Sequence, residues 1–160
     1  MLKIKSIPAF LLFILLIFHS CDDTKNPVDS SKSFTGISYT DENGIITKDD
    51  TNDWQPRITF PLPDLLSSEP AYPNPTNNTI TIIYGLAKQA DVLIEIYREP
   101  GEVIKTLANE PLTAGKYTII WDTKDNDGND VSNGIFRVKI VAESNNVEIY
   151  ETYGDVEVKR

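Results

Sequence analysis

Residues 79–97 read TITIIYGLAKQADVLIEIY, and this stretch decides the fold class of the chain. Residues 79–84 are rich in β-branched side chains, and apolar and polar side chains alternate at the end of residues 91–97. Both patterns are typical of β-strands. Asn78 before the first run and Gly85 after it are turn residues. We therefore predict two short strands here.

The same kind of run recurs further along the chain. Predicted strands follow at residues 102–107, 116–121, 135–142, 146–151 and 155–159. We expect the last two to form a hairpin that turns at Tyr153 and Gly154. No stretch of helical periodicity separates the strands, so the sequence predicts an all-β, Ig-like antiparallel β-sandwich over residues 72–160 rather than an α/β fold.

Residues 33–71 predict a small β-hairpin followed by a proline-marked linker. Short apolar runs at residues 36–40 and 45–47 flank Asn43-Gly44, and Asn-Gly favours a tight hairpin turn. Trp54 lies in the linker, and we expect it to dock on the following domain rather than bind a ligand.

Residues 1–20 have the features of a lipoprotein signal peptide, which would be helical and cleaved. Lys3 and Lys5 precede an apolar run at residues 9–18, which is too short to span a bilayer comfortably. Cys21 follows directly, and we expect it to carry a diacylglyceryl thioether with palmitate-type chains. Polar residues 21–32 then form a flexible tether.

Other interpretations of this leader stay open. The segment also fits a plain signal peptide or a single anchor helix with an incidental cysteine. Asp22 and Asp23 fit an inner-membrane retention cue, a surface-export cue or simple solvation. Our expectation is a lipid-anchored envelope protein, placed at the outer membrane, with its periplasmic or surface face left open.

The leader also limits the chemistry of the mature chain. The chain has one histidine, His19, and one cysteine, Cys21. Cleavage removes the first and the lipid blocks the second, so no Ser-His-Asp or Cys-His nucleophile and no His or Cys zinc site remain. We expect no enzyme and no cofactor, although an all-carboxylate enzyme is not excluded by this argument.

The charge excludes nucleic acid as a partner. The chain has 15 basic and 24 acidic residues, a net charge of −9. Loss of Lys3 and Lys5 leaves 13 against 24, a net charge of −11. Nucleic-acid binding depends on basic side chains that neutralise phosphates.

The acidic loop at residues 122–133 allows a calcium hypothesis, because hard cations take several oxygen ligands. The candidates are Asp122, Asp125, Asp127 and Asp130. In an EF-hand alignment with Gly128 at the glycine position, Thr123 and Gly134 occupy the two terminal ligand positions, where neither fits. A solvated acidic turn is the alternative, and we assign no metal.

Several short motifs occur in a fixed order: YPNP at residues 72–75, TIIYGL at 81–86, VLIEIY at 92–97, GEVIKTL at 101–107, AGKY at 114–117, WD at 121–122, DGN at 127–129 and VSNGIF at 131–136. Residues 72–142 thereby resemble the Ig-like domain of the flagellar hook-capping protein, and that family is related to C-terminal sorting domains of type IX secretion. The resemblance implies binding or assembly rather than catalysis, with Trp121 as a core residue.

Three functions follow as expectations. The first is a non-catalytic, lipid-anchored envelope protein that presents its Ig-like module to an unknown protein or glycan, or for structural assembly. The second is a sorting module for type IX secretion, for which the basic end of residues 156–160 (VEVKR) is suitable. The third is a carbohydrate-binding accessory, which requires an exposed, flat strip of aromatic side chains. The candidates for that strip are Tyr39, Trp54, Tyr150 and Tyr153.

Overall fold

A computed structural model describes residues 34, 36–59, 62, 64–98, 101–145 and 148–160. Its strands are β1 (Tyr39–Thr40), β2 (Ile46–Lys48), β3 (Leu66–Tyr72), β4 (Ile80–Leu86), β5 (Ala90–Arg98), β6 (Glu102–Leu112), β7 (Gly115–Trp121), β8 (Gly134–Ser144) and β9 (Glu148–Val158). These described ranges contain no helix, and so none that is long and apolar enough to cross a membrane. The expected leader, Cys21 and the tether lie outside them.

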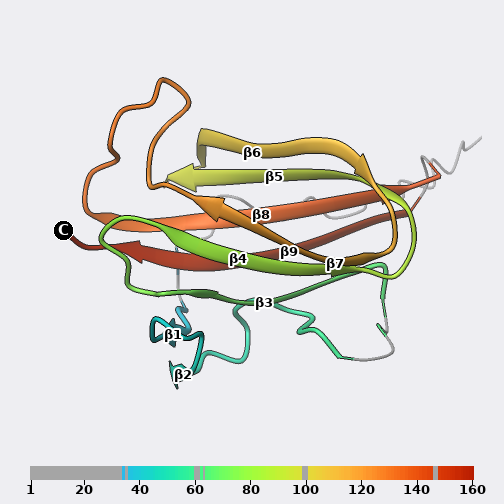
Figure 1. Cartoon of the computed structure of the whole chain (residues 1–160), viewed down its shortest axis with the longest axis horizontal. Helices are drawn as coiled ribbons and strands as arrows, with labels where there is room; N and C mark the ends of the chain where they lie inside the picture. Colours follow the sequence, from blue (N-terminus) through green and yellow to red (C-terminus); the bar gives the residue numbers. More distant parts are fainter. Residues whose placement is uncertain (1–33, 35, 60–61, 63, 99–100, 146–147) are drawn as a thin grey trace, which may run out of the picture.

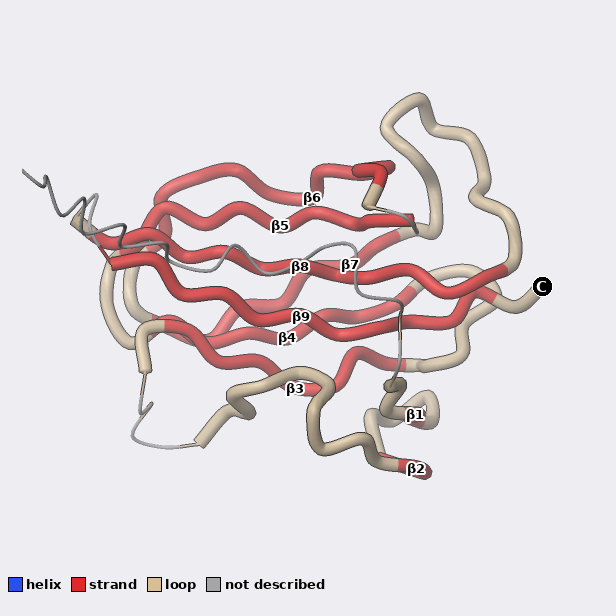
Figure 2. Tube along the Cα trace, turned by 180° about the vertical axis from the view of Figure 1, so that it is seen from behind, coloured by secondary structure: helices blue, strands red, loops and turns tan. Residues whose placement is uncertain are grey.

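Two antiparallel sheets make up the main body. One has the strand order β3-β4-β7, and the other has the order β6-β5-β8-β9. Figure 1 shows β3, β4 and β7 in one layer, and Figure 2 shows β9, β8, β5 and β6 side by side from behind. This arrangement confirms the predicted all-β, Ig-like antiparallel sandwich.

The core lies between the two sheets because alternate side chains of each strand point inward. Buried members include Ile80, Ile82 and Tyr84 of β4, Val92, Ile94 and Ile96 of β5, and Val138 and Ile140 of β8. Trp121 of β7 meets Phe136 of β8 edge to face, with their ring centroids 5.4 Å apart. Trp121 is fully buried, so its predicted place in the core is confirmed.

The sandwich begins earlier than the sequence indicated. We expected a linker up to residue 71, but residues 66–72 form β3, which pairs antiparallel with β4 from Leu66↔Leu86 onward. The short polar run Ser67-Ser68-Glu69 and the proline at position 70 hide this strand from a pattern analysis. Pairing with β4 therefore makes residues 66–71 part of the sandwich rather than of a linker.

The expected final hairpin is wrong. Residues 148–158 form the single strand β9, which pairs with β8 without a break from Ser144↔Glu148 to Gly134↔Val158. Tyr153 and Gly154 lie inside the strand. A glycine within a strand often marks the close approach of another group. Here that group is the indole of Trp54, since a Cβ built on Gly154 would lie 1.8 Å from its Cε2 atom.

The segment before β3 packs on the sandwich. Its predicted hairpin is present as β1 and β2, and Gly44 has the positive φ of 79° that such a turn requires. Trp54 is fully buried among the core residues, and its backbone N–H donates to the carbonyl oxygen of Tyr153 at 2.9 Å. The predicted docking of Trp54 on the domain is therefore confirmed.

Candidate functional site

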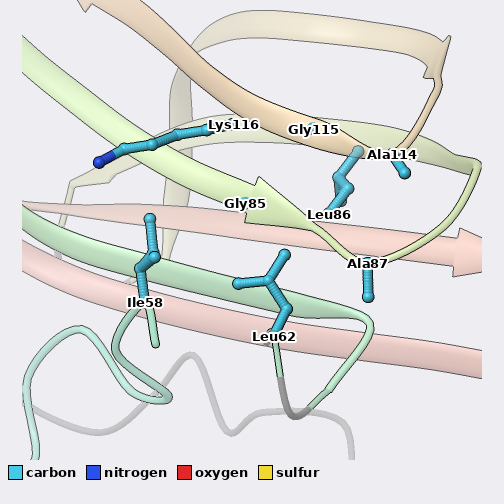
Figure 3. A pocket seen from close by; sticks show the side chains of 8 residues that line it. All are labelled: Ile58, Leu62, Gly85, Leu86, Ala87, Ala114, Gly115 and Lys116. Atoms are coloured by element: carbon cyan, nitrogen blue, oxygen red, sulfur yellow. The ribbon is translucent and has the colours of Figure 1, made fainter. Parts of the chain in front are cut away.

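The outer face of the three-stranded sheet carries an apolar groove at the end where β4 stops and β7 starts. Its volume is about 450 Å³, and it is lined by Ile58, Leu62, Gly85, Leu86, Ala87, Ala114, Gly115 and Lys116. Figure 3 shows Ile58 and Leu62 on the chain segment that runs below the strands, facing β4 and β7 across the groove. The groove is therefore shaped by strand backbone on one side and aliphatic side chains on the other.

Gly85 explains why a hollow forms on a sheet that would otherwise carry side chains there. A Cβ at this position would approach both Cδ atoms of Leu62 to 3.3 Å, which is closer than ordinary contact. The missing side chain lets Leu62 lie over the strand. Most small-molecule and peptide sites are likewise concave and mostly apolar.

Lys116 is the only titratable side chain among the described residues that line the groove. Its Nζ atom lies 2.8 Å from Glu69 Oε1, an exposed ion pair at the edge of the face. A groove with this lining can hold an apolar side chain, but it offers no carboxylate, thiol or imidazole for acid–base or nucleophilic chemistry.

A second hollow of about 340 Å³ adjoins the groove. It shares Ile58 with the groove and is otherwise lined by Asn43, Gly44, Ile46, Arg57, Glu69, Pro70, Tyr72 and Ile83. The β1–β2 hairpin supplies Ile46, which is 40% exposed. We call the two hollows and the strand surface between them the outer face, and it is the best candidate for a binding surface.

A buried polar cluster joins the N-terminal segment to β8 and β9. Arg137 donates from Nε to Asp155 Oδ1 at 2.8 Å and from Nη2 to Oδ2 at 2.9 Å. The guanidinium also lies 4.3 Å from the ring centroid of Tyr153 and 4.7 Å from that of Phe34. The Asp155 carboxylate neutralises the charge of the guanidinium, and the two aromatic rings lie against it. Arg137 therefore helps to fasten the N-terminal segment to β8 and β9.

Asp53 is the second acid of the polar cluster. Its carboxylate accepts N–H groups from Ser38 at 2.8 Å and from Asp155 at 2.9 Å. Burial raises the pKa of Asp53 to about 7, against the lowering effect of those two N–H groups. The adjoining cavity is only about 80 Å³, so the cluster is better suited to fastening the segment than to holding a ligand.

The four calcium candidates serve separate purposes. Asp125 Oδ1 accepts the N–H groups of Asp127 and Asn129 at 3.0 and 2.9 Å, and these bonds lower the pKa of Asp125. Asp122 accepts from the N–H of Lys124, and Asp130 lies 3.7 Å from the Arg160 guanidinium. Asp127 is exposed. Over the described ranges, no group of three or more His, Cys, Asp or Glu side chains could hold a metal ion.

The four aromatic candidates do not form a flat exposed strip. Trp54 is fully buried, and Tyr39, Tyr150 and Tyr153 are each half-buried. Arg137 lies over the ring of Tyr153, and Tyr150 packs against the core. The feature that a carbohydrate-binding accessory requires is therefore not formed by these residues.

The C-terminal arginine is tied to the acidic loop. Arg160 donates to the carbonyl oxygen of Val131 and, at 2.6 Å, to Thr123 Oγ1. Its backbone N–H donates to Asn133 Oδ1 at 3.0 Å. The basic end that suggested a sorting signal is thus packed against the chain's own loop.

The fold and the outer face define an Ig-like module without a catalytic constellation among the groove-lining residues that the structure describes. Residues 74–146 match the family model of the FlgD Ig-like domain. This match confirms the resemblance inferred from the sequence, and it leaves β3 and β9 outside its limits. No curated protein matches the chain.

Solved structures give weaker likenesses, each to a small part of a much larger chain. The crystal structure of dimeric latent PorU from Porphyromonas gingivalis aligns with 63% of this chain and 10% of its own, at 19% identity and a TM-score of 0.49. PorZ from the same organism, described as an essential surface component of the type IX secretion system, aligns with 56% of this chain and 11% of its own. The identity is 22% and the TM-score 0.39.

Proposed function

We propose that this chain is a non-catalytic, lipid-anchored protein of the cell envelope whose Ig-like module binds a protein or takes part in structural assembly. The observation that carries the binding role is the outer face, where an apolar groove opens on a sheet surface that a soluble module would normally keep polar. The match of residues 74–146 to a family of Ig-like modules supports the same role.

The anchor rests on the sequence. Cys21 stands where an apolar run of signal-peptide length ends and acidic, polar chain begins. A diacylglyceryl group on Cys21 would hold the module at a membrane surface, and the polar residues after it would act as a spacer. The outer membrane is our choice of membrane.

Intact mass of the membrane-extracted protein tests the anchor. The expected product begins at Cys21 and carries the added mass of a diacylglyceryl group. Cys21→Ala should lose that mass, whereas the matched control Ser20→Ala, which keeps a small residue before the cysteine, should retain it. An unlipidated chain cut at another position would contradict the proposal.

The intact-mass measurement also distinguishes the lipid-anchored protein from the alternative, a sorting module for type IX secretion. A chain shortened at its C-terminus would indicate that residues 72–160 are read and removed by export machinery. Fusion of residues 34–160, which keep every described strand, to a periplasmic reporter, with the reporter's appearance outside the cell as readout, would then test that role directly.

A further inference from the structure

Three of the four edges of the two main sheets are covered by described parts of the chain itself. At β3, Ser68 donates its N–H to the Pro56 carbonyl oxygen at 2.9 Å and accepts from the Ile58 N–H at 3.1 Å. Along β9, the Tyr153 carbonyl accepts from Trp54, and the Glu157 carbonyl accepts from Thr76 at 2.8 Å. Both edges have therefore lost much of their capacity to pair with another strand.

The edge at β6 is blocked in a different way. Asn126 of the acidic loop donates its N–H to the Ile104 carbonyl at 2.9 Å, and its side chain accepts from the Thr106 N–H at 3.2 Å. Pro111 lies near the end of β6, and the register with β5 shifts at two places. Proline and irregular register are common devices that protect a sheet edge.

The fourth edge, β7, has none of these protections among the described residues. It pairs with β4 in unbroken register from Ile80↔Trp121 to Leu86↔Gly115, and it contains no proline. Of the strands that the structure describes, only β4 runs alongside it. It is therefore a regular edge of the kind to which a further strand can be added.

The hydrogen bonds at the β3 edge determine which residues of β7 direct their backbone N–H and C=O groups to the free edge. Ser68 directs both of its backbone groups away from β4, so Ser68 and Tyr84, which lie opposite each other, form a non-hydrogen-bonded pair. Tyr84 then directs its groups to Tyr117 on β7. Because the pattern alternates, Thr118 directs its N–H and C=O to the free edge, as do its neighbours two positions away, Lys116 and Ile120.

We propose that a second copy of this chain occupies the β7 edge, with the two β7 strands antiparallel about a two-fold axis at Thr118. This register places Thr118 opposite Thr118 and Lys116 opposite Ile120, so no like charges face each other. Ile120 is 60% exposed, and strand pairing with the second copy would cover part of it. The product is one continuous sheet with the order β3-β4-β7-β7-β4-β3.

Charge also favours this edge. Each chain carries a net charge of −9, which opposes self-association in general. However, β4 and β7 contain no carboxylate, and Lys116 is their single charged residue. The four central strands of the joined sheet would therefore be free of the acidic groups that dominate the rest of the chain.

This inference names the partner for the proposed assembly role and rests on that role, but not on the lipid at Cys21. Engineered cysteines in the full-length chain test it, with a short thiol-to-thiol cross-linker and denaturing gels. Wild type, whose only cysteine is Cys21, gives the background. Ile45→Cys is the matched control, because Ile45 is 62% exposed and lies beside β2, away from the edge.

The proposed register of the two β7 strands predicts which cysteine variants cross-link. Thr118→Cys alone should give covalent dimer several-fold above Ile45→Cys. Lys116→Cys and Ile120→Cys should each give little alone, and dimer several-fold above background when the two chains are produced together. Equal yields from all variants, or background yields from Thr118→Cys and from the mixed pair, would overturn the proposal.

A proline substitution tests the backbone contribution. Thr118→Pro removes one N–H that points to the free edge and leaves pairing with β4 intact, as tolerated on edge strands. Added to the mixed pair, it should reduce the cross-linked dimer several-fold, while thermal unfolding stays cooperative. Retained cross-linking in the folded variant would contradict strand pairing. If the variant does not fold, the cysteine pattern decides, and the mass of the Cys21 product tests the anchor independently.

Discussion

One glycine determines where the largest side chain of the N-terminal segment lies. Gly154 sits in β9 beneath the indole of Trp54, with no room for a Cβ atom. Gly154→Ala should displace the indole, and Trp54→Ala should leave a cavity that costs about 3–5 kcal/mol of unfolding free energy. We expect the double variant to lose clearly less than the sum of the two, measured by urea denaturation.

Gly115→Ala is the matched control for this pair. Gly115 also lies in a strand, but its added Cβ would meet only the Tyr117 ring at 3.5 Å, an ordinary contact. This variant should stay within about 1 kcal/mol of wild type. Strict additivity of Trp54→Ala and Gly154→Ala would show that the contact between them does not carry the effect.

Asp53 gives the chain a specific dependence on pH. Its pKa rises from 3.8 to about 7 on folding because of burial, so the folded state keeps a proton that the unfolded chain releases. The protonated Asp53 therefore contributes to the unfolding free energy, and this contribution is fully present below about pH 4 and is lost as pH rises through 7. The change amounts to at most about 4 kcal/mol.

Asp53→Asn should remove that part of the pH dependence. The readout is the difference in unfolding free energy between wild type and variant from pH 4 to pH 8. The exposed control Asp122→Asn should leave the wild-type slope unchanged. A difference that does not vary with pH would contradict the raised pKa of Asp53.

At the scale of the strand, β7 shows how alternation separates adjacent isoleucines. Ile119 points into the sandwich and packs against the core, whereas Ile120 points to solvent. At protein concentrations low enough to keep the chain monomeric, Ile119→Lys should lower the unfolding free energy by about 2–4 kcal/mol, since it buries a charge. Ile120→Lys should change it by less than about 0.5 kcal/mol under the same conditions. Equal losses in thermal or chemical unfolding would contradict the register of β7 with β4.

The loop between β7 and β8 is fastened to the neighbouring strands and to the C-terminal residue by several hydrogen bonds. Asp125 organises its turn, Asn126 covers β6, and Trp121 Nε1 donates to the Lys124 carbonyl at 2.9 Å. Arg160 closes the loop from the other side through Thr123 and Val131. Asp122 and Asp125, two of the side chains that suggested calcium, are thus placed by local turn chemistry, in which Asp accepts N–H groups two or four residues ahead.

For the whole molecule, the segment before β4 is part of the folding unit. A chain of residues 72–160, which starts at the boundary expected from the sequence, lacks nearly all of β3, Asp53 of the polar cluster and Trp54. It should show no cooperative thermal unfolding, because the edge of β4 and the core near Gly154 are exposed. Residues 34–160 keep every described strand and should unfold cooperatively at the wild-type temperature. A cooperative transition of the shorter chain at that temperature would contradict this view.

The sequence by itself determined the fold class, most of the strands and the family resemblance. Alternation and β-branched runs depend on neighbours only a few residues apart, so β4, β5, β7 and β8 were predictable. The hairpin turn at Gly44 was predictable for the same reason. β3 was not, because its polar run and proline resemble a linker until β4 lies beside it.

The tertiary structure alone decided the polar cluster, the outer face and the free edge. Asp53 and Asp155 are 102 residues apart, and their contact depends on how the N-terminal segment crosses β9. The groove likewise depends on Leu62 lying over Gly85. Which sheet edges are covered is a property of chain paths rather than of local pattern, and this is why β7 is distinguished from the other edges only once the sandwich is assembled.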